Sequence, residues 1–138
     1  MDKKPRALPP PLCKAILICE RVEFDPVTRQ LNLWGVLDRF HVSSFPGYTS
    51  SFFVFLLLTD SIGEREVWVE VHDLRDGRVL ARARPDRFQF PRRTDSIFWH
   101  LACPPLFLSS PGRYDLITFC DGEEIDRLKF AAVADSAE

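Results

Sequence analysis

The chain has 138 residues, 46% hydrophobic and 28% charged, as expected of one globular domain rather than a disordered segment. Its formal net charge of −2 argues against a nucleic-acid partner, because phosphate binding needs a concentrated basic surface. Its longest apolar run, residues 52–58, is too short for a membrane helix of about 20 residues, so we expect no membrane partner.

The first 13 residues contain prolines at positions 5, 9, 10 and 11, which predicts a Pro-rich N-terminal lead without sheet pairing. We expect a single β domain over residues 14–133 and a C-terminal tail over residues 134–138. The basic start runs into prolines instead of an apolar signal core, which favours a cytoplasmic location.

The four cysteines lack the CxxC spacing and the histidine companions of a zinc site. Cys19, Cys103 and Cys120 fall within apolar strand patterns, which predicts buried, reduced thiols. Cys13 lies in the Pro-rich lead, and we expect it to be exposed.

Residues 14–24 and 31–42 are predicted to form an antiparallel hairpin. Asp25-Pro26-Val27-Thr28 between them has the residues of a tight turn. Gly35 within the second strand indicates a bulge or a close approach of the backbone. Phe45-Pro46-Gly47-Tyr48 then marks a loop.

Residues 52–59 are hydrophobic throughout, which predicts a central strand buried on both faces. Residues 65–73 alternate strictly. The valines at 67, 69 and 71 are expected to face the core, and Trp68, Glu70 and His72 to face outward.

The remaining strands are shorter. We expect an Arg-rich edge strand over residues 78–84, a loop containing Pro85 and Pro91, and a strand over 96–103. Residues 113–121 and 124–133 then form a hairpin around the turn Asp121-Gly122.

About eight short strands without a helical pattern predict an all-β fold. We expect an antiparallel two-sheet sandwich of immunoglobulin-like character, although the pattern does not separate a sandwich from a barrel.

Two stretches resemble a bacterial domain family of unknown function. The opening hairpin is similar in residues 15–20, 25–28 and 33–39, and the closing hairpin in residues 110–116 and 119–122. The Phe45-Pro46 loop between them also fits. Arg29 departs from the pattern, because a glycine is usual after the turn threonine. The resemblance implies a fold, in which the Tyr114 hydroxyl anchors a corner of the sandwich, but it implies no activity and no site residues.

No constellation in the sequence supports catalysis. Glu20 and Asp38, each followed by arginine, are better explained as charges on a solvated hairpin than as an acid–base pair. The three histidines, His41, His72 and His100, show no ligand spacing, and neither a nucleophile elbow nor a phosphate loop is present. We therefore expect a non-enzymatic protein without a metal or cofactor.

Outward-facing aromatic residues are the remaining functional signal. Trp68 and His72 occupy one outward phase, and Phe98 and His100 occupy the phase opposite Ile97, Trp99 and Leu101. A loop, the Pro-rich lead or a second chain is needed to cover such rings. We expect a protein-binding or assembly module whose partner is another protein or a second copy, with Trp68, His72, Phe98 and His100 as candidate interface residues. The alternative is a sandwich that binds a small ligand or carbohydrate.

Overall fold

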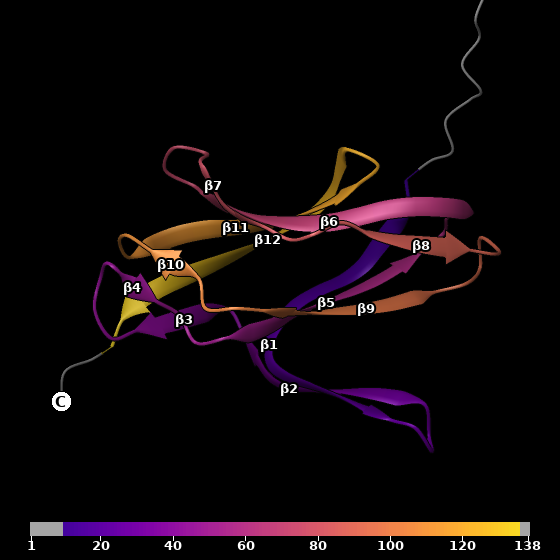
Figure 1. Ribbon diagram of the computed structural model, residues 1–138, viewed down its shortest axis with the longest axis horizontal. Coiled ribbons are helices and arrows are strands. Elements are labelled where there is room, and N and C mark those ends of the chain that lie inside the picture. Colours follow the sequence, from indigo (N-terminus) through magenta and orange to yellow (C-terminus); the bar gives the residue numbers. More distant parts are fainter. Residues whose placement is uncertain (1–9, 136–138) are drawn as a thin grey trace, which may run out of the picture.

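The computed structural model describes residues 10–135, which form twelve β-strands in two main sheets and one small sheet, without a helix (Figure 1). The four-stranded sheet contains, in spatial order, β2 (Gln30–Leu37), β1 (Leu12–Asp25), β5 (Phe52–Thr59) and β9 (Ile97–Cys103). The six-stranded sheet contains β3 (Arg39–Val42), β12 (Glu123–Ala134), β11 (Gly112–Cys120), β6 (Gly63–Asp73) and β7 (Val79–Arg82), with β8 (Asp86–Phe90) paired to β6. The small sheet pairs β4 (Gly47–Tyr48) with β10 (Phe107–Leu108). The all-β class is therefore confirmed.

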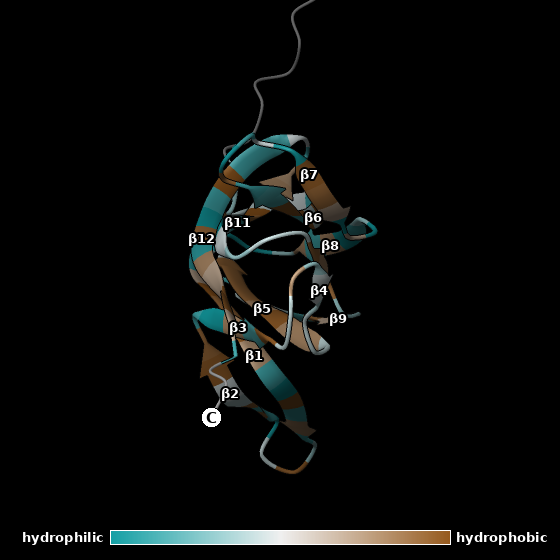
Figure 2. Ribbon diagram, turned by 90° about the vertical axis from the view of Figure 1, so that its left-hand side faces the viewer, coloured by the Kyte–Doolittle hydropathy of each residue, from teal (hydrophilic) through white to brown (hydrophobic). Residues whose placement is uncertain are grey.

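The two main sheets enclose one hydrophobic core. β5 contributes Val54, Leu56 and Leu58 to it, and this strand is hydrophobic along its length (Figure 2). From the opposite sheet, Val67 and Val69 of β6 face the same core, as the alternating pattern predicted. Side chains from both sheets thus pack against each other between the layers, as in proteins built from two packed layers.

The expected number and direction of strands need correction. Residues 31–42 form two strands, not one, because the chain leaves the four-stranded sheet after Leu37 and enters the six-stranded sheet as β3. There β3 pairs parallel to β12, so the fold is not wholly antiparallel. The predicted loop around residues 85–91 contains β8, in which Phe90 is fully buried.

The β1–β2 hairpin forms an arm that extends beyond the layer of β5 and β9 (Figures 1 and 2). Its turn is held by the Asp25 carboxylate, which accepts hydrogen bonds from the amides of Val27 (2.9 Å) and Thr28 (3.3 Å). Arg29 follows with φ +59°, a left-handed conformation that glycine adopts without steric cost.

Gly35 of β2 leaves room for the side chain of Glu20 on β1. It has φ +67°, and a Cβ atom there would overlap the carboxylate of Glu20 on the neighbouring strand. The close neighbour of this glycine is therefore a side chain, and neither the predicted bulge nor the predicted close approach of the backbone is seen there.

The closing hairpin joins β11 and β12 through Asp121 and Gly122. Tyr114, at the start of β11, is 1% exposed and donates its hydroxyl hydrogen bond to the Ser110 carbonyl (2.5 Å). The hydrogen bond expected of this hydroxyl is therefore present.

All four cysteines are free thiols. Cys19 and Cys120 are buried and Cys103 is half-buried. The prediction of an exposed Cys13 is wrong, because this residue lies in β1 and packs against the core. Burial, with a smaller contribution from Asp126, raises the pKa of the Cys13 thiol to about 12.

Candidate functional site

The outer face of the six-stranded sheet carries two of the candidate interface residues, Trp68 and His72. Both project from β6 away from the core, as predicted, but Trp68 is only 7% exposed. Its ring stacks on Phe119 at a centroid distance of 5.4 Å, and the Arg82 guanidinium lies 5.1 Å from its centroid. The expectation of an exposed Trp68 is therefore wrong, since side chains from β11 and β7 cover it.

Glu70 connects the groups on this part of the face. It accepts hydrogen bonds from Trp68 Nε1 (2.9 Å), shares a 2.8 Å contact with His72 Nε2, and lies 3.4 Å from Arg82. Burial raises the pKa of Glu70, but the hydrogen bonds from His72 and Trp68 and the charges of His72 and Arg82 outweigh it. The pKa therefore lies below its ordinary value.

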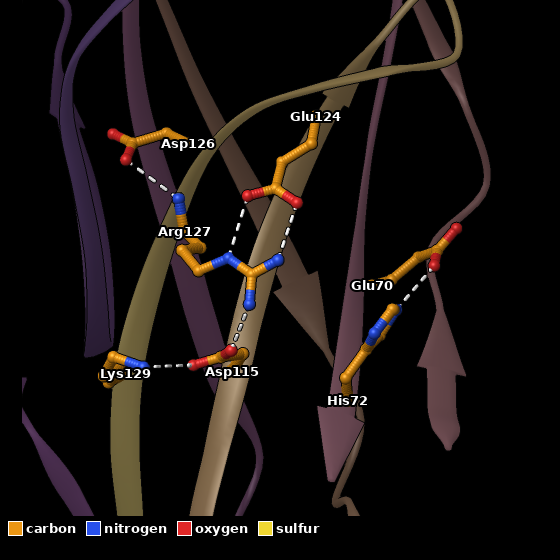
Figure 3. Close-up of polar contacts among 7 residues, drawn as sticks. All are labelled: Glu70, His72, Asp115, Glu124, Asp126, Arg127 and Lys129. Atoms are coloured by element: carbon orange, nitrogen blue, oxygen red, sulfur yellow. Dashed lines mark hydrogen bonds and ion pairs between the residues drawn. The ribbon is translucent and has the colours of Figure 1, made fainter. Parts of the chain in front are cut away.

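A second polar cluster lies beside it on β11 and β12 (Figure 3). Asp115 is fully buried, and its Oδ2 accepts a 2.6 Å hydrogen bond from Arg127 Nη1. Arg127 also donates from Nε and Nη2 to both carboxylate oxygens of Glu124, at 2.8 and 2.6 Å. Lys129 Nζ lies 3.8 Å from Asp115 Oδ1, an oxygen that has no hydrogen-bond partner among residues 10–135.

These contacts close the outer face with the protein's own charged side chains. Ile117, between the two clusters, is 2% exposed although it points away from the core. The hydrogen bonds and charge of Arg127 lower the pKa of Glu124, so neither Glu70 nor Glu124 has the raised pKa that suits a general acid. The arrangement stabilises the sheet and offers little to a ligand.

Phe98 and His100 lie on the outer face of the other main sheet. Both project from β9 and are exposed, and Phe98 is 58% exposed. Phe98 stacks on Phe55 of β5, with ring centroids 6.1 Å apart. The structure therefore separates the four candidates into two pairs on different sheets, and only the Phe98 pair is open to solvent.

The arm and this exposed face enclose a groove of about 370 Å³. Its walls are Leu31 and Leu33 of β2 on one side and Phe55 and Phe98 on the other. The polar side chains that line it come from Arg29 and Gln30, at the start of β2. The groove is thus an apolar surface that the folded chain leaves open.

The tip of the arm is also apolar. Phe24, near the end of β1, is 54% exposed, and Val27, within the turn that joins β1 to β2, is 89% exposed. The arm residues were not among the candidate interface residues predicted from the sequence. The signal was present, because Phe24, Val27, Leu31 and Leu33 place four apolar side chains within ten residues of a predicted turn.

A second hollow, of about 340 Å³, lies between the two main sheets where β7 faces β9. Within residues 10–135, no group of three or more His, Cys, Asp or Glu side chains is placed to hold a metal ion. The described part of the chain likewise contains no helix long and apolar enough to cross a membrane.

Comparison with known proteins assigns the chain to a family. No curated protein matches it. Residues 14–133 match the model of a family described as "Family of unknown function (DUF6941)". This match covers most of the chain and both of the hairpins that bound the fold, and the protein therefore belongs to the DUF6941 family, whose function is unknown.

Proposed function

We propose that this domain is a non-enzymatic assembly module that binds a second copy of itself through the β1–β2 arm and the groove beside Phe98. The observation that supports this most strongly is the placement of exposed apolar side chains on both elements. Phe24 and Val27 are exposed at the arm tip, and Phe98 is exposed in the groove. Grouped exposed apolar surface is typical of protein–protein interfaces.

A second copy suits this surface because the same chain carries a projection and a matching hollow. Two copies related by a twofold axis place each arm against the other copy's groove, so that every contact is made twice. The tip residue Val27 then lies in the groove between Leu33 on one wall and Phe98 on the other. Such an exchange buries the rings of Phe24 and Phe98, which the monomer leaves exposed to water.

The free edge of β9 adds a second means of association. β9 is the last strand of the four-stranded sheet, so one row of its backbone groups lacks a strand partner in that sheet. Pairing of edge strands supplies main-chain hydrogen bonds while neighbouring side chains provide specificity. Phe98 and His100 project from this strand and would flank an added strand.

The finer fold assignment also remains our proposal: an immunoglobulin-like sandwich. The adjacent strands β6, β11 and β12 correspond in order to strands C, F and G of that fold, and β1, β5 and β9 to strands A, B and E. The Tyr114 hydrogen bond to the Ser110 carbonyl supports the same assignment, because it resembles a tyrosine corner. A cytoplasmic location likewise stays a prediction, and the four free thiols are compatible with it.

Self-association is tested by light scattering after size-exclusion chromatography of the wild type, Phe98→Asp and Tyr48→Asp. Tyr48 is a matched control, because it is an aromatic residue 65% exposed on the small sheet, away from the groove. We expect the wild type and Tyr48→Asp to form dimers and Phe98→Asp to be monomeric. Dimers that survive Phe98→Asp, or that are lost only in Tyr48→Asp, would place the interface elsewhere.

The alternative predicted from the sequence, binding of a small molecule, is favoured by a different observation, the hollow between the sheets. A carbohydrate is less well supported than an apolar ligand. Sugars need several polar side chains beside an exposed ring, whereas Phe98 has only Arg29 and Gln30 as polar companions in its groove.

A further inference from the structure

The cavity between the two main sheets lies at their open side, where the edge strand β7 faces the edge strand β9. Its volume is about 340 Å³, within the range of small-molecule sites. Val69, Val71 and Leu116 line it from the six-stranded sheet, and Phe52 and Leu101 from the four-stranded sheet. The interior of the cavity is therefore a continuation of the hydrophobic core.

Small side chains leave this space unfilled. Ala81 and Ala83 are the residues that the β7 segment turns toward the core, opposite the wider side chains of β6. Cys103 lines the other side, and its thiol donates a weak hydrogen bond to the Leu101 carbonyl (3.7 Å). Burial raises the pKa of the Cys103 thiol to about 11, so at neutral pH it is an uncharged, largely apolar group.

Positive charge marks the solvent side of the cavity. Arg82 and Arg84 both contribute to its lining and both are exposed. Arg82 is already engaged, since it lies over Trp68 and forms an ion pair with Glu70. No carboxylate pairs with Arg84 in the part of the chain that the structure describes.

We propose that this cavity binds a medium-chain alkyl carboxylate, with the chain between the sheets and the carboxylate at Arg84. The volume sets the size of the ligand. An apolar cavity of about 150 Å³ holds benzene, so 340 Å³ has room for about a dozen non-hydrogen atoms. Octanoate and decanoate have that size.

The chemistry of the walls selects this class over others. A polar ligand would lose its hydrogen bonds to water, because the walls consist mainly of alkyl and aromatic groups. A cation would be repelled by Arg84 at the rim, whereas the charge of Arg82 lies over Trp68 on the outer face of the sheet. An alkyl carboxylate places each part in a matching environment, and its carboxylate fits the planar donor group of arginine.

Isothermal titration calorimetry of sodium octanoate into the wild type and Ala83→Leu tests the location of the site. Leucine at position 83 fills the cavity, so we expect wild-type binding to be lost while circular dichroism shows a folded protein. Unchanged binding to folded Ala83→Leu would overturn the proposal, as would an absence of binding to the wild type. The cavity and the arm groove share no lining residue, so a failure of octanoate binding is distinguishable from a failure of association through the arm and groove.

Variants of exposed residues test recognition of the carboxylate, and we expect them to fold. Arg84→Glu is compared with Arg113→Glu, an exposed arginine of β11 that does not line the cavity and gives the same change in net charge. We expect Arg84→Glu to weaken octanoate binding about tenfold or more and Arg113→Glu to leave it within about twofold. Equal weakening by the two variants, or equal affinity of the wild type for octanol and octanoate, would show that Arg84 does not recognise the carboxylate.

Discussion

Replacement of Arg127 by methionine should expose the cost of a buried carboxylate. The side chain of Asp115 is 1% exposed and has a 2.6 Å hydrogen bond from Arg127. Loss of one partner from a buried ion pair costs about 3–5 kcal/mol, because the other charge stays buried and uncompensated. Lys129 remains 3.8 Å from the second Asp115 oxygen, and Arg127 itself is 42% exposed. We therefore expect Arg127→Met to lower the unfolding free energy by about 3 kcal/mol, the lower end of this range.

Urea unfolding followed by tryptophan fluorescence measures this loss. Lys129→Met is the control, and it should cost less than about 1 kcal/mol because the Lys129 side chain is 63% exposed. The double variant Asp115→Leu/Arg127→Met should recover much of the lost stability, since neither charge is then buried. A cost below about 1 kcal/mol for Arg127→Met, or a double variant no more stable than Arg127→Met, would refute the reasoning.

Three further predictions follow from single contacts. Arg29→Gly should raise the unfolding free energy by about 0.5–1 kcal/mol, because Arg29 has φ +59° and glycine removes the left-handed strain at some entropic cost. Thermal denaturation measures this change, and a lower midpoint for Arg29→Gly than for the wild type would contradict the prediction. Tyr114→Phe should cost about 1 kcal/mol in urea unfolding by removing the hydroxyl donor to the Ser110 carbonyl, and an unchanged midpoint would remove its anchoring role. The lowered pKa of Glu70 means that its contribution to stability is complete above its ordinary pKa and is lost as the pH falls through the folded-state value. Unfolding at a series of acidic pH values should therefore show a shallower loss in Glu70→Gln than in the wild type, and identical slopes would contradict this.

The sequence correctly predicted the strands whose hydrophobic pattern indicates which of their faces are buried. Residues 52–59 are apolar on both faces, and β5 has those bounds because it lies between two other strands. The valines of β6 were correctly predicted to face the core, since successive side chains of a strand point to opposite faces of the sheet. β8 was missed although Phe88 and Phe90 alternate, because Pro85 and Pro91 around them indicated a loop.

Features that depend on distant pairing were not predictable. Asp38 and Arg39 interrupt the apolar residues of the segment 31–42, but the sequence does not indicate that the chain changes sheets there or that β3 pairs parallel to β12. The burial of Trp68 depends on Phe119, 51 positions later, and on Arg82 of a neighbouring strand. Periodicity gives the direction of a side chain but not what covers it.

The candidate site likewise has features that the sequence predicts and features that depend on distant pairing. Phe98 and His100 were correctly predicted to face outward, because the opposite phase of β9 packs toward the core. The groove beside Phe98 was not predictable, since it exists only because the β1–β2 arm lies opposite that face. Asp115 and Arg127 were also missed, as each looks like an ordinary charged residue until β11 and β12 pair.

The most direct test of the central claim is sedimentation equilibrium of the wild-type protein over a wide range of concentrations. Association through the arm and groove predicts a mass of twice 15.9 kDa that decreases to 15.9 kDa on dilution. A mass of 15.9 kDa at every concentration would contradict self-assembly and leave the exposed Phe98 surface without the partner proposed for it.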